Sequence, residues 1–196
     1  MFVYIFLEEI LFSLFTYKNI FSLLLSIYSI VFAMQYPLEP NQVSLGSAFT
    51  IGIPAFLLTF EENQKKQQNG NFLRKVFKNS LPAAITSFLV IVAMVRFSVL
   101  FNVGGQEITT ACSYLFFTGG FLILYKIIRP LNKYRSSVIA LCILGVLLTI
   151  NIMPDFFAIK AISGRAAALV TLFAIAEFSV IRWITLVLDK FGKNRI

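Results

Sequence analysis

The sequence predicts an all-α integral membrane protein, a bundle of six transmembrane helices with both ends of the chain in the cytoplasm. Of the 196 residues, 58% are hydrophobic and 13% are charged, whereas soluble domains average about 25% charged residues. Several apolar stretches reach the roughly 20 residues that an α-helix needs to cross a bilayer. Basic residues gather in alternate loops between these stretches, which is the pattern that orients membrane proteins.

The first two spans are expected at residues 11–34 and 41–60. The apolar stretch that contains the first span is too long for one crossing at about 1.5 Å per residue, so residues 1–10 should continue the helix on the cytoplasmic side. Pro37 and Pro40 mark the turn that follows, because proline cannot continue a helix. The second span is the least apolar of the six.

A polar segment at residues 61–80 separates the second span from the third and is expected to form a cytoplasmic loop. Asn79 or Ser80 should cap the third helix, with Pro82 in its first turn. All spans should form one transmembrane domain covering residues 1–196. The last four spans are expected at residues 81–101, 108–128, 136–153 and 166–188.

Charge asymmetry predicts the orientation of the helices. The loops after the second and fourth spans and the C-terminal tail are rich in lysine and arginine, whereas the other loops carry only Lys160 and Arg165. By the positive-inside rule, the basic set faces the cytoplasm and both termini lie there. The basic set comprises Lys65, Lys66, Arg74, Lys75, Lys78, Lys126, Arg129, Lys133, Arg135, Lys190, Lys193 and Arg195.

Composition excludes several kinds of catalytic site. The chain has no histidine, so imidazole metal ligands and histidine-based triads are absent, and we expect no catalytic residues. Cys112 and Cys142 stand alone in different apolar runs, which favours simple packing. The net charge of +8 is dispersed over short loops, so membrane lipid rather than nucleic acid should be the partner. The expected location is a cell membrane, crossed several times.

The second span contains a polar stripe beside a helix break. Pro54 has no N–H, so the carbonyl of Thr50 loses its helical partner, and Gly52 tolerates distortion. Ser44 and Ser47 precede Thr50 at three-residue spacing. This pattern predicts either a path for a hard cation or a kinked helix packed through small residues.

Three other polar residues lie within the spans. Asn19 in the first span is expected to be buried, where its amide would need partners. Glu177 lies near the middle of the sixth span, where an ionised carboxylate is costly and suggests a functional site. Arg96 could reach Glu177 or the outer headgroups. The alternatives for Glu177 are a structural ion pair, a protonated carboxyl or a role in transport.

The run Phe-Thr-Ile-Gly-Ile-Pro-Ala-Phe, with an upstream glutamine, resembles the sixth transmembrane helix of P-type cation-transporting ATPases, especially those of bacteria. Residues of the first span resemble the end of the fifth helix of that family, and the segment from Asn71 to Pro82 follows its pattern after the sixth helix. The resemblance implies that the chain corresponds to the last six helices of a ten-helix pump, truncated or split, in a bacterial plasma membrane. The matching residues are Leu14, Phe15, Lys18, Ile20, Phe21, Ser22, Pro40, Gln42, Thr50, Gly52, Pro54 and Ala55.

The sequence also departs from that family. Ile51 and Ser22 stand where calcium pumps carry acidic ligands, so a high-affinity divalent site is not expected. By resemblance, Asn19, Ser47 and Thr50 fall at positions of polar ligands, which leaves a site of neutral oxygens for an inorganic cation.

The phosphorylation motif and the nucleotide-binding domain of that family are absent. The chain alone should therefore not hydrolyse ATP, and ATP and Mg²⁺ are expected only with a separately encoded catalytic half. The leading interpretation is the membrane portion of a P-type cation pump. The alternatives are a stand-alone six-helix transporter or channel, or a non-functional pump remnant.

Overall fold

The computed structural model describes residues 2–61, 72–101 and 103–193, and these form helices joined by turns, with no strand among them. The helical path is interrupted by a π-helix, η1, within the second crossing. The elements are α1 (Phe2–Val31), α2 (Pro40–Ser47), η1 (Ala48–Gly52), α3 (Ile53–Leu58), α4 (Phe72–Leu100), α5 (Gly105–Ile127), α6 (Lys133–Ile152) and α7 (Gly164–Lys193).

Six segments of the described chain are long and apolar enough to cross a membrane, which confirms the expected fold class. Elements α2, η1 and α3 together make one crossing, and the other five long helices make one each. The six segments are Glu8–Val31, Pro40–Leu58, Lys75–Leu100, Gly105–Ile127, Lys133–Ile152 and Gly164–Ile184.

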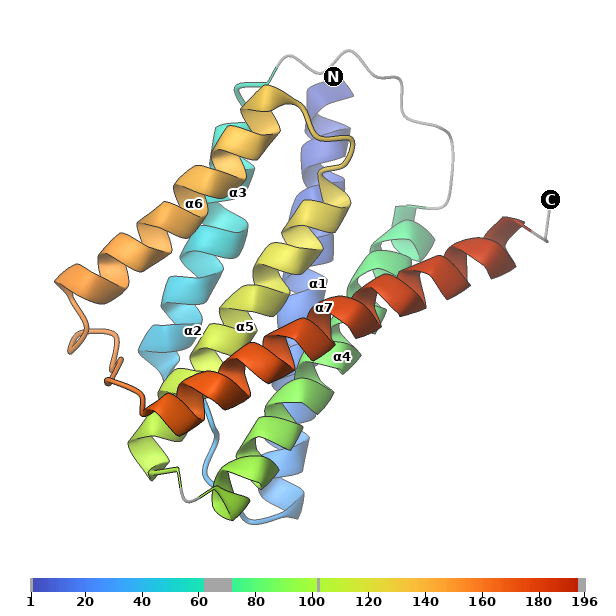
Figure 1. Cartoon of the computed structure of the whole chain (residues 1–196). Coiled ribbons are helices and arrows are strands. Elements are labelled where there is room, and N and C mark those ends of the chain that lie inside the picture. Colours follow the sequence, from blue (N-terminus) through green and yellow to red (C-terminus); the bar gives the residue numbers. More distant parts are fainter. Residues whose placement is uncertain (1, 62–71, 102, 194–196) are drawn as a thin grey trace.

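Helix α4 lies at the centre of the largest group of contacts. It packs against α1, α5 and α7, and α5 in turn packs against α7 and α2. Helix α6 lies at the edge of the molecule and packs mainly against α3 and η1 (Figure 1). The chain therefore places the second and fifth crossings side by side, although about 70 residues separate them in sequence.

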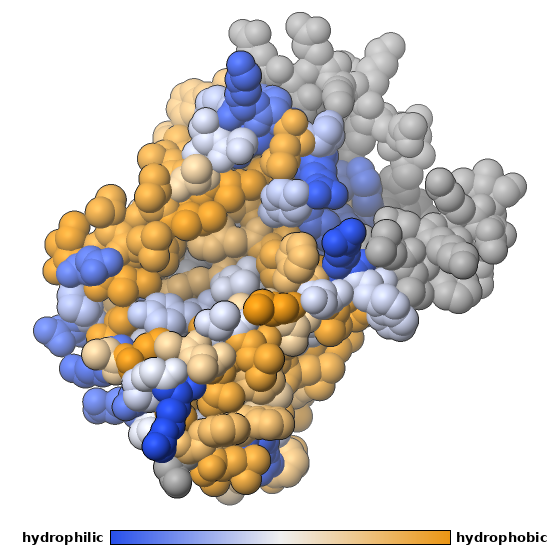
Figure 2. Space-filling view, in the orientation of Figure 1, coloured by the Kyte–Doolittle hydropathy of each residue, from blue (hydrophilic) through white to orange (hydrophobic). Residues whose placement is uncertain are grey.

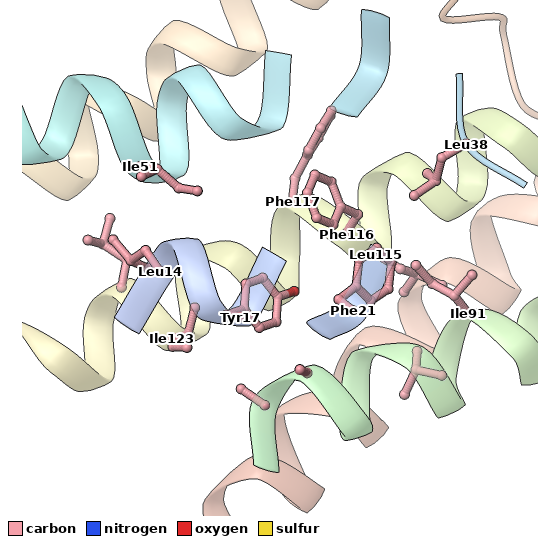
Figure 3. Packing of buried hydrophobic residues seen from close by; sticks show 14 of the residues in the cluster. Leu14, Tyr17, Phe21, Leu38, Ile51, Ile91, Leu115, Phe116, Phe117 and Ile123 are labelled. Carbon is pink, nitrogen blue, oxygen red and sulfur yellow. The ribbon is translucent and has the colours of Figure 1, made fainter. Parts of the chain in front are cut away.

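The interior is aliphatic and aromatic. Figure 3 shows Leu14, Tyr17 and Phe21 of α1 facing residues of α5, with the Phe21 and Phe116 rings stacked at 5.2 Å between centroids. The outward faces are also apolar, as the orange flanks in Figure 2 show. Exposure of apolar surfaces of this extent is unfavourable in water but not in lipid, so the surface is consistent with a membrane location.

The start of α4 corrects the expected start of the third helix. The prediction that Asn79 or Ser80 caps this helix is wrong, because α4 begins at Phe72 and carries Pro82 in its interior. Contacts with α1 hold the added turns: the Phe72 ring meets Phe12 edge-on at 5.6 Å, and Lys75 Nζ lies 2.8 Å from a carboxylate oxygen of Glu9. The helix therefore continues through Pro82, which cannot donate a hydrogen bond to it.

The helix ends fall into two groups. The N-terminus, the end of α3 and the turn between α5 and α6 lie at one end of the bundle, and the turns after α1, α4 and α6 lie at the other (Figure 1). Part of the basic loop expected at 61–80, including Lys65 and Lys66, lies outside the described residues. Which end faces the cytoplasm stays a prediction.

Candidate functional site

The second crossing is distorted just before Pro54. Over Ala48–Gly52 the backbone forms the π-helix η1, in which the N–H of Ile53 donates to the carbonyl of Ala48, five residues earlier. Pro54 follows in the first turn of α3, where its missing N–H is tolerated. The break expected from the sequence is therefore present, and π-helical turns are frequent at functional sites.

The hydroxyls of the polar stripe are all engaged by their own helix. Ser44 donates to the carbonyl of Pro40 at 2.9 Å, and Ser47 donates to Val43 at 2.6 Å. Thr50 donates to the carbonyl of Gly46 at 2.7 Å. With the protons directed back along the helix, the oxygen lone pairs are what these groups can offer a cation.

The three hydroxyl residues differ in their surroundings. Thr50 is buried, with 3% of its surface exposed, whereas Ser47 is half-buried and Ser44 is exposed. Thr50 packs directly on the backbone of α5, since a Cβ added at Gly120 would lie 2.7 Å from Cγ2 of Thr50. Small residues permit this close approach between helices, as is common in membranes.

Other residues expected in the path lie elsewhere. Asn19 is exposed on α1, so the structure does not bring its amide into the interior beside Thr50. Gly52 is exposed too, and an added Cβ would meet no atom within 4 Å. Pro54 is buried. Of the expected set, Thr50 and Pro54 therefore lie inside the bundle, and Ser47 lies at its margin.

Gln42, part of the family resemblance, has a structural role at the start of α2. Its side chain is fully buried, and Nε2 donates to the carbonyl of Ala158 at 2.9 Å. Its Oε1 accepts from the N–H of Glu39 at 3.1 Å. Neighbouring Asn41 donates to the carbonyl of Phe156 at 2.8 Å. These bonds hold the turn between α6 and α7 against the second crossing.

A second polar group lies where α1, α4, α5 and α7 meet. Glu177 on α7 is fully buried, and its Oε1 accepts a hydrogen bond from Oγ of Ser87 on α4 at 2.5 Å. Ser87 accepts in turn from the hydroxyl of Tyr17 on α1 at 3.0 Å. The other carboxyl oxygen, Oε2, has no hydrogen-bond partner within the described chain. We call Tyr17, Ser87 and Glu177 the buried polar cluster.

Gly119 of α5 makes room for this cluster. An added Cβ there would contact Oγ of Ser87 and lie 2.5 Å from Oε1 of Glu177 and 2.6 Å from the Tyr17 hydroxyl. These distances are far inside van der Waals contact, so a larger residue at position 119 would displace these side chains. Because Gly120 receives Thr50, the cluster and Thr50 pack on adjacent residues of α5.

Arg96 does not pair with Glu177. Its guanidinium lies 4.7 Å from the ring centroid of Phe32, which directly follows α1, and 5.6 Å from that of Tyr28, in the last turn of α1. Arg96 is exposed, so it makes cation–π contacts near the membrane boundary. Arg182, on the same helix as Glu177, is exposed as well.

Sequence reasoning identified Glu177 but missed its partners. Tyr17 and Ser87 look like ordinary residues of apolar spans, and only the packing of three helices brings them to Glu177. The adjacent pair Gly119 and Gly120 was the available signal, because two glycines inside an apolar helix predict close approach by other elements.

The groups that these two sites could offer to a metal ion are neutral hydroxyl and carbonyl oxygens and the carboxyl of Glu177. Among the residues that the structure describes, no group of three or more His, Cys, Asp or Glu side chains could hold a metal ion. Any cation bound near Thr50 would rely on hydroxyl and carbonyl oxygens.

Comparison with known proteins identifies the relatives of the chain. No family model matches it. Over 144 residues it is 31% identical to a protein of Streptococcus pneumoniae named probable cation-transporting ATPase exp7, and 69% of the chain is covered. The chain is a homologue of cation-transporting P-type ATPases. This P-type ATPase homologue is also 28% identical over 158 residues, or 71% of its length, to the calcium-transporting ATPase CtpE of Mycolicibacterium smegmatis. The matches span 18% and 19% of those relatives.

Proposed function

We propose that the chain forms the membrane, ion-pathway portion of a P-type cation pump, and that a separately encoded catalytic half supplies ATP hydrolysis. The observation that carries the proposal is the π-helical break at Ala48–Gly52, with buried Thr50 inside it. The relatives named as cation-transporting ATPases support the same conclusion.

A broken helix at membrane depth is suited to binding an ion. A π-helical turn departs from the regular α-helical hydrogen-bond pattern and is frequent at functional sites, and backbone carbonyls freed from that pattern can coordinate cations. Pro54 has no N–H to return to the carbonyl of Thr50, and the Thr50 hydroxyl keeps its lone pairs. We therefore propose that Thr50 supplies two oxygens at one point, its hydroxyl and its carbonyl, with the Ser47 hydroxyl one turn away.

The ligand set is neutral. Ile51 is buried and apolar, so the second crossing offers no carboxylate between Thr50 and Gly52. The affinity of an oxygen site for a divalent cation depends on the number of charged ligands and on its rigidity. We therefore propose a site of low charge, in which dehydration of the ion is offset by hydroxyl and carbonyl oxygens.

Two variants test the proposal in liposomes that contain the chain and its catalytic half. Thr50→Val keeps the shape of the side chain but removes its oxygen, and Pro54→Ala restores the missing helical donor. Both should lower ion-dependent ATP hydrolysis at least about tenfold, which corresponds to roughly 1.4 kcal/mol for a lost ligand. Membrane insertion and assembly should be preserved.

Thr149→Val is the matched control. Thr149 lies on α6 and donates to the carbonyl of Gly145 at 2.7 Å, the same local bond that Thr50 makes. Its loss should leave ion dependence unchanged. Full activity in both Thr50→Val and Pro54→Ala would show that the break is a packing feature. Ion flux through the chain without any catalytic half would instead support the stand-alone channel.

A further inference from the structure

We propose that the buried polar cluster is a proton-binding site, in which the Glu177 carboxyl carries a proton while Ser87 and Tyr17 hold its other oxygen in place. This site is distinct from the proposed cation path at Thr50. Proton binding at this cluster does not require a catalytic half, so it can be tested independently of the proposed function.

The fully buried carboxyl of Glu177 has no counter-charge among the residues that the structure describes. Helices α4 and α5 pack against α7, and they bring the neutral Ser87 hydroxyl and Gly119 to Glu177, while α1 brings the hydroxyl of Tyr17. Within the described residues no lysine or arginine forms an ion pair with Glu177. An ionised carboxylate in that setting is expensive, and binding a proton removes the charge.

The oxygens of the buried polar cluster form one hydrogen-bonded line that ends at the carboxyl of Glu177. Oγ of Ser87 lies 3.0 Å from the Tyr17 hydroxyl and 2.5 Å from Oε1 of Glu177; a Tyr17 hydroxyl that donates to Ser87 leaves the Ser87 hydroxyl to donate to Oε1. Oε1 is the accepting, carbonyl-like oxygen of a protonated acid. The proton then belongs on Oε2, the oxygen that has no partner among the described residues.

The buried polar cluster suits a proton better than a metal cation. A cation of the size of Na⁺ or Ca²⁺ needs several converging oxygens with free lone pairs. Here the Ser87 oxygen already accepts from Tyr17, and no second carboxyl lies in the cluster. A proton needs one oxygen and no coordination shell. The geometry of the cluster therefore matches the smaller ligand.

Infrared spectroscopy of the full chain in phosphatidylcholine vesicles tests the proposal. At about pH 7, an exposed glutamate, which titrates at about 4.3, is ionised and has no protonated-acid carbonyl band. The wild-type chain should show one such band, which should move when glutamate is labelled with carbon-13 at its side-chain carboxyl. Glu177→Gln should remove it, and Glu107→Gln, at the polar start of α5, should leave it intact.

The infrared spectrum of the Ser87→Ala variant provides a second test. It should keep the band but shift it to higher frequency, because the acid carbonyl loses a hydrogen bond; a purely structural role for Ser87 would not predict that shift. If Glu177→Gln fails to insert, the carbon-13 shift and the Ser87→Ala shift together still assign the band. No protonated band in the wild type would overturn the proposal. A band that disappears when Na⁺ is added would overturn it in favour of a cation site.

Discussion

At the residue scale, the two glycines at the middle of α5 determine what can lie beside that helix. Gly119 accommodates three of the four side-chain oxygens of the buried polar cluster, and Gly120 accommodates Thr50. Each glycine lacks the Cβ methyl group that alanine would place where a neighbouring element meets the backbone of α5. A helix normally loses about 1 kcal/mol for each glycine relative to alanine, so the close packing has to outweigh that cost.

Gly119→Ala should therefore destabilise the protein, although alanine favours helices. Its Cβ would lie within 2.6 Å of the Tyr17 hydroxyl, and the cluster would have to move. We expect a loss of about 1–3 kcal/mol in the free energy of unfolding, as for other overpacked sites. Unfolding in mixed detergent micelles would measure it.

Gly52→Ala is the control for that prediction. It is the same substitution in a membrane-embedded helical turn, but the added Cβ meets no atom within 4 Å. Its stability should equal that of the wild type or exceed it slightly. Equal effects of the two substitutions would show that Gly119 does not make room for the cluster.

Residue-level prediction succeeded where the cause is local and failed where it is tertiary. The break near Pro54 could be predicted because a missing N–H acts on the same helix. The exposure of Asn19 and the cation–π contacts of Arg96 depend on how helices rotate against one another. The hydrophobic pattern does not determine which face of a helix points inward when both the protein interior and the lipid are apolar.

At the scale of the elements, one buried ion pair ties the end of the second crossing to the start of the fifth. The Arg135 guanidinium meets both carboxylate oxygens of Glu61 through Nε, at 2.9 and 2.8 Å, and also donates to the carbonyls of Ile128 and Pro130. The two side chains are only 5% and 10% exposed. This ion pair reinforces the packing of α6 on α3 and η1.

Arg135→Met should destabilise the protein by on the order of 3 kcal/mol, because it leaves the Glu61 carboxylate buried without its main partner. Chemical unfolding in micelles would measure the change. Lys160→Met is the matched control: its pair with Asp155, at 3.4 Å, is largely exposed and should contribute less than about 1 kcal/mol. Similar losses in both variants would contradict a special role for the buried pair.

The number of membrane crossings and their helical type were predictable because an apolar run must be long enough to cross the bilayer. The start of α4 was not predictable in the same way. Proline and cap residues near position 80 favoured a boundary, but Phe72 and Lys75 meet α1 residues some 60 positions earlier, and those contacts extend the helix. Tertiary contacts can move the start of a helix away from the residues that local cap and proline signals favour.

At the scale of the whole molecule, the charges at the two ends predict the orientation in the membrane. Helix α6 begins at Lys133. Its start and the turn from α5 lie at one end of the bundle, and the start of α5, which Gly104 precedes, lies at the opposite end (Figure 1). The positive-inside rule places the first end in the cytoplasm. Both native cysteines are fully buried, so they should not react with a water-soluble reagent.

Cysteine labelling in intact cells would test that orientation. Gly104→Cys should react with a membrane-impermeant maleimide, whereas Lys133→Cys should react only after the cells are opened. Both positions are exposed, so a difference between them reports the side of the membrane. Labelling of Lys133→Cys from outside would invert the topology and contradict the expected N-in, C-in arrangement.

The unequal lengths of the crossings have a mechanical consequence. The crossing that contains the π-helix has 19 residues and that of α4 has 26. At about 1.5 Å per residue these correspond to roughly 28 and 39 Å, against a hydrocarbon layer of about 30 Å. The longer helix can match the layer by tilting, but the shorter one has no length to spare. In a thicker bilayer, the mismatch between helix length and hydrocarbon thickness would therefore strain the π-helical crossing that carries Thr50. Membrane thickness thus becomes a physical variable that acts on the proposed ion path.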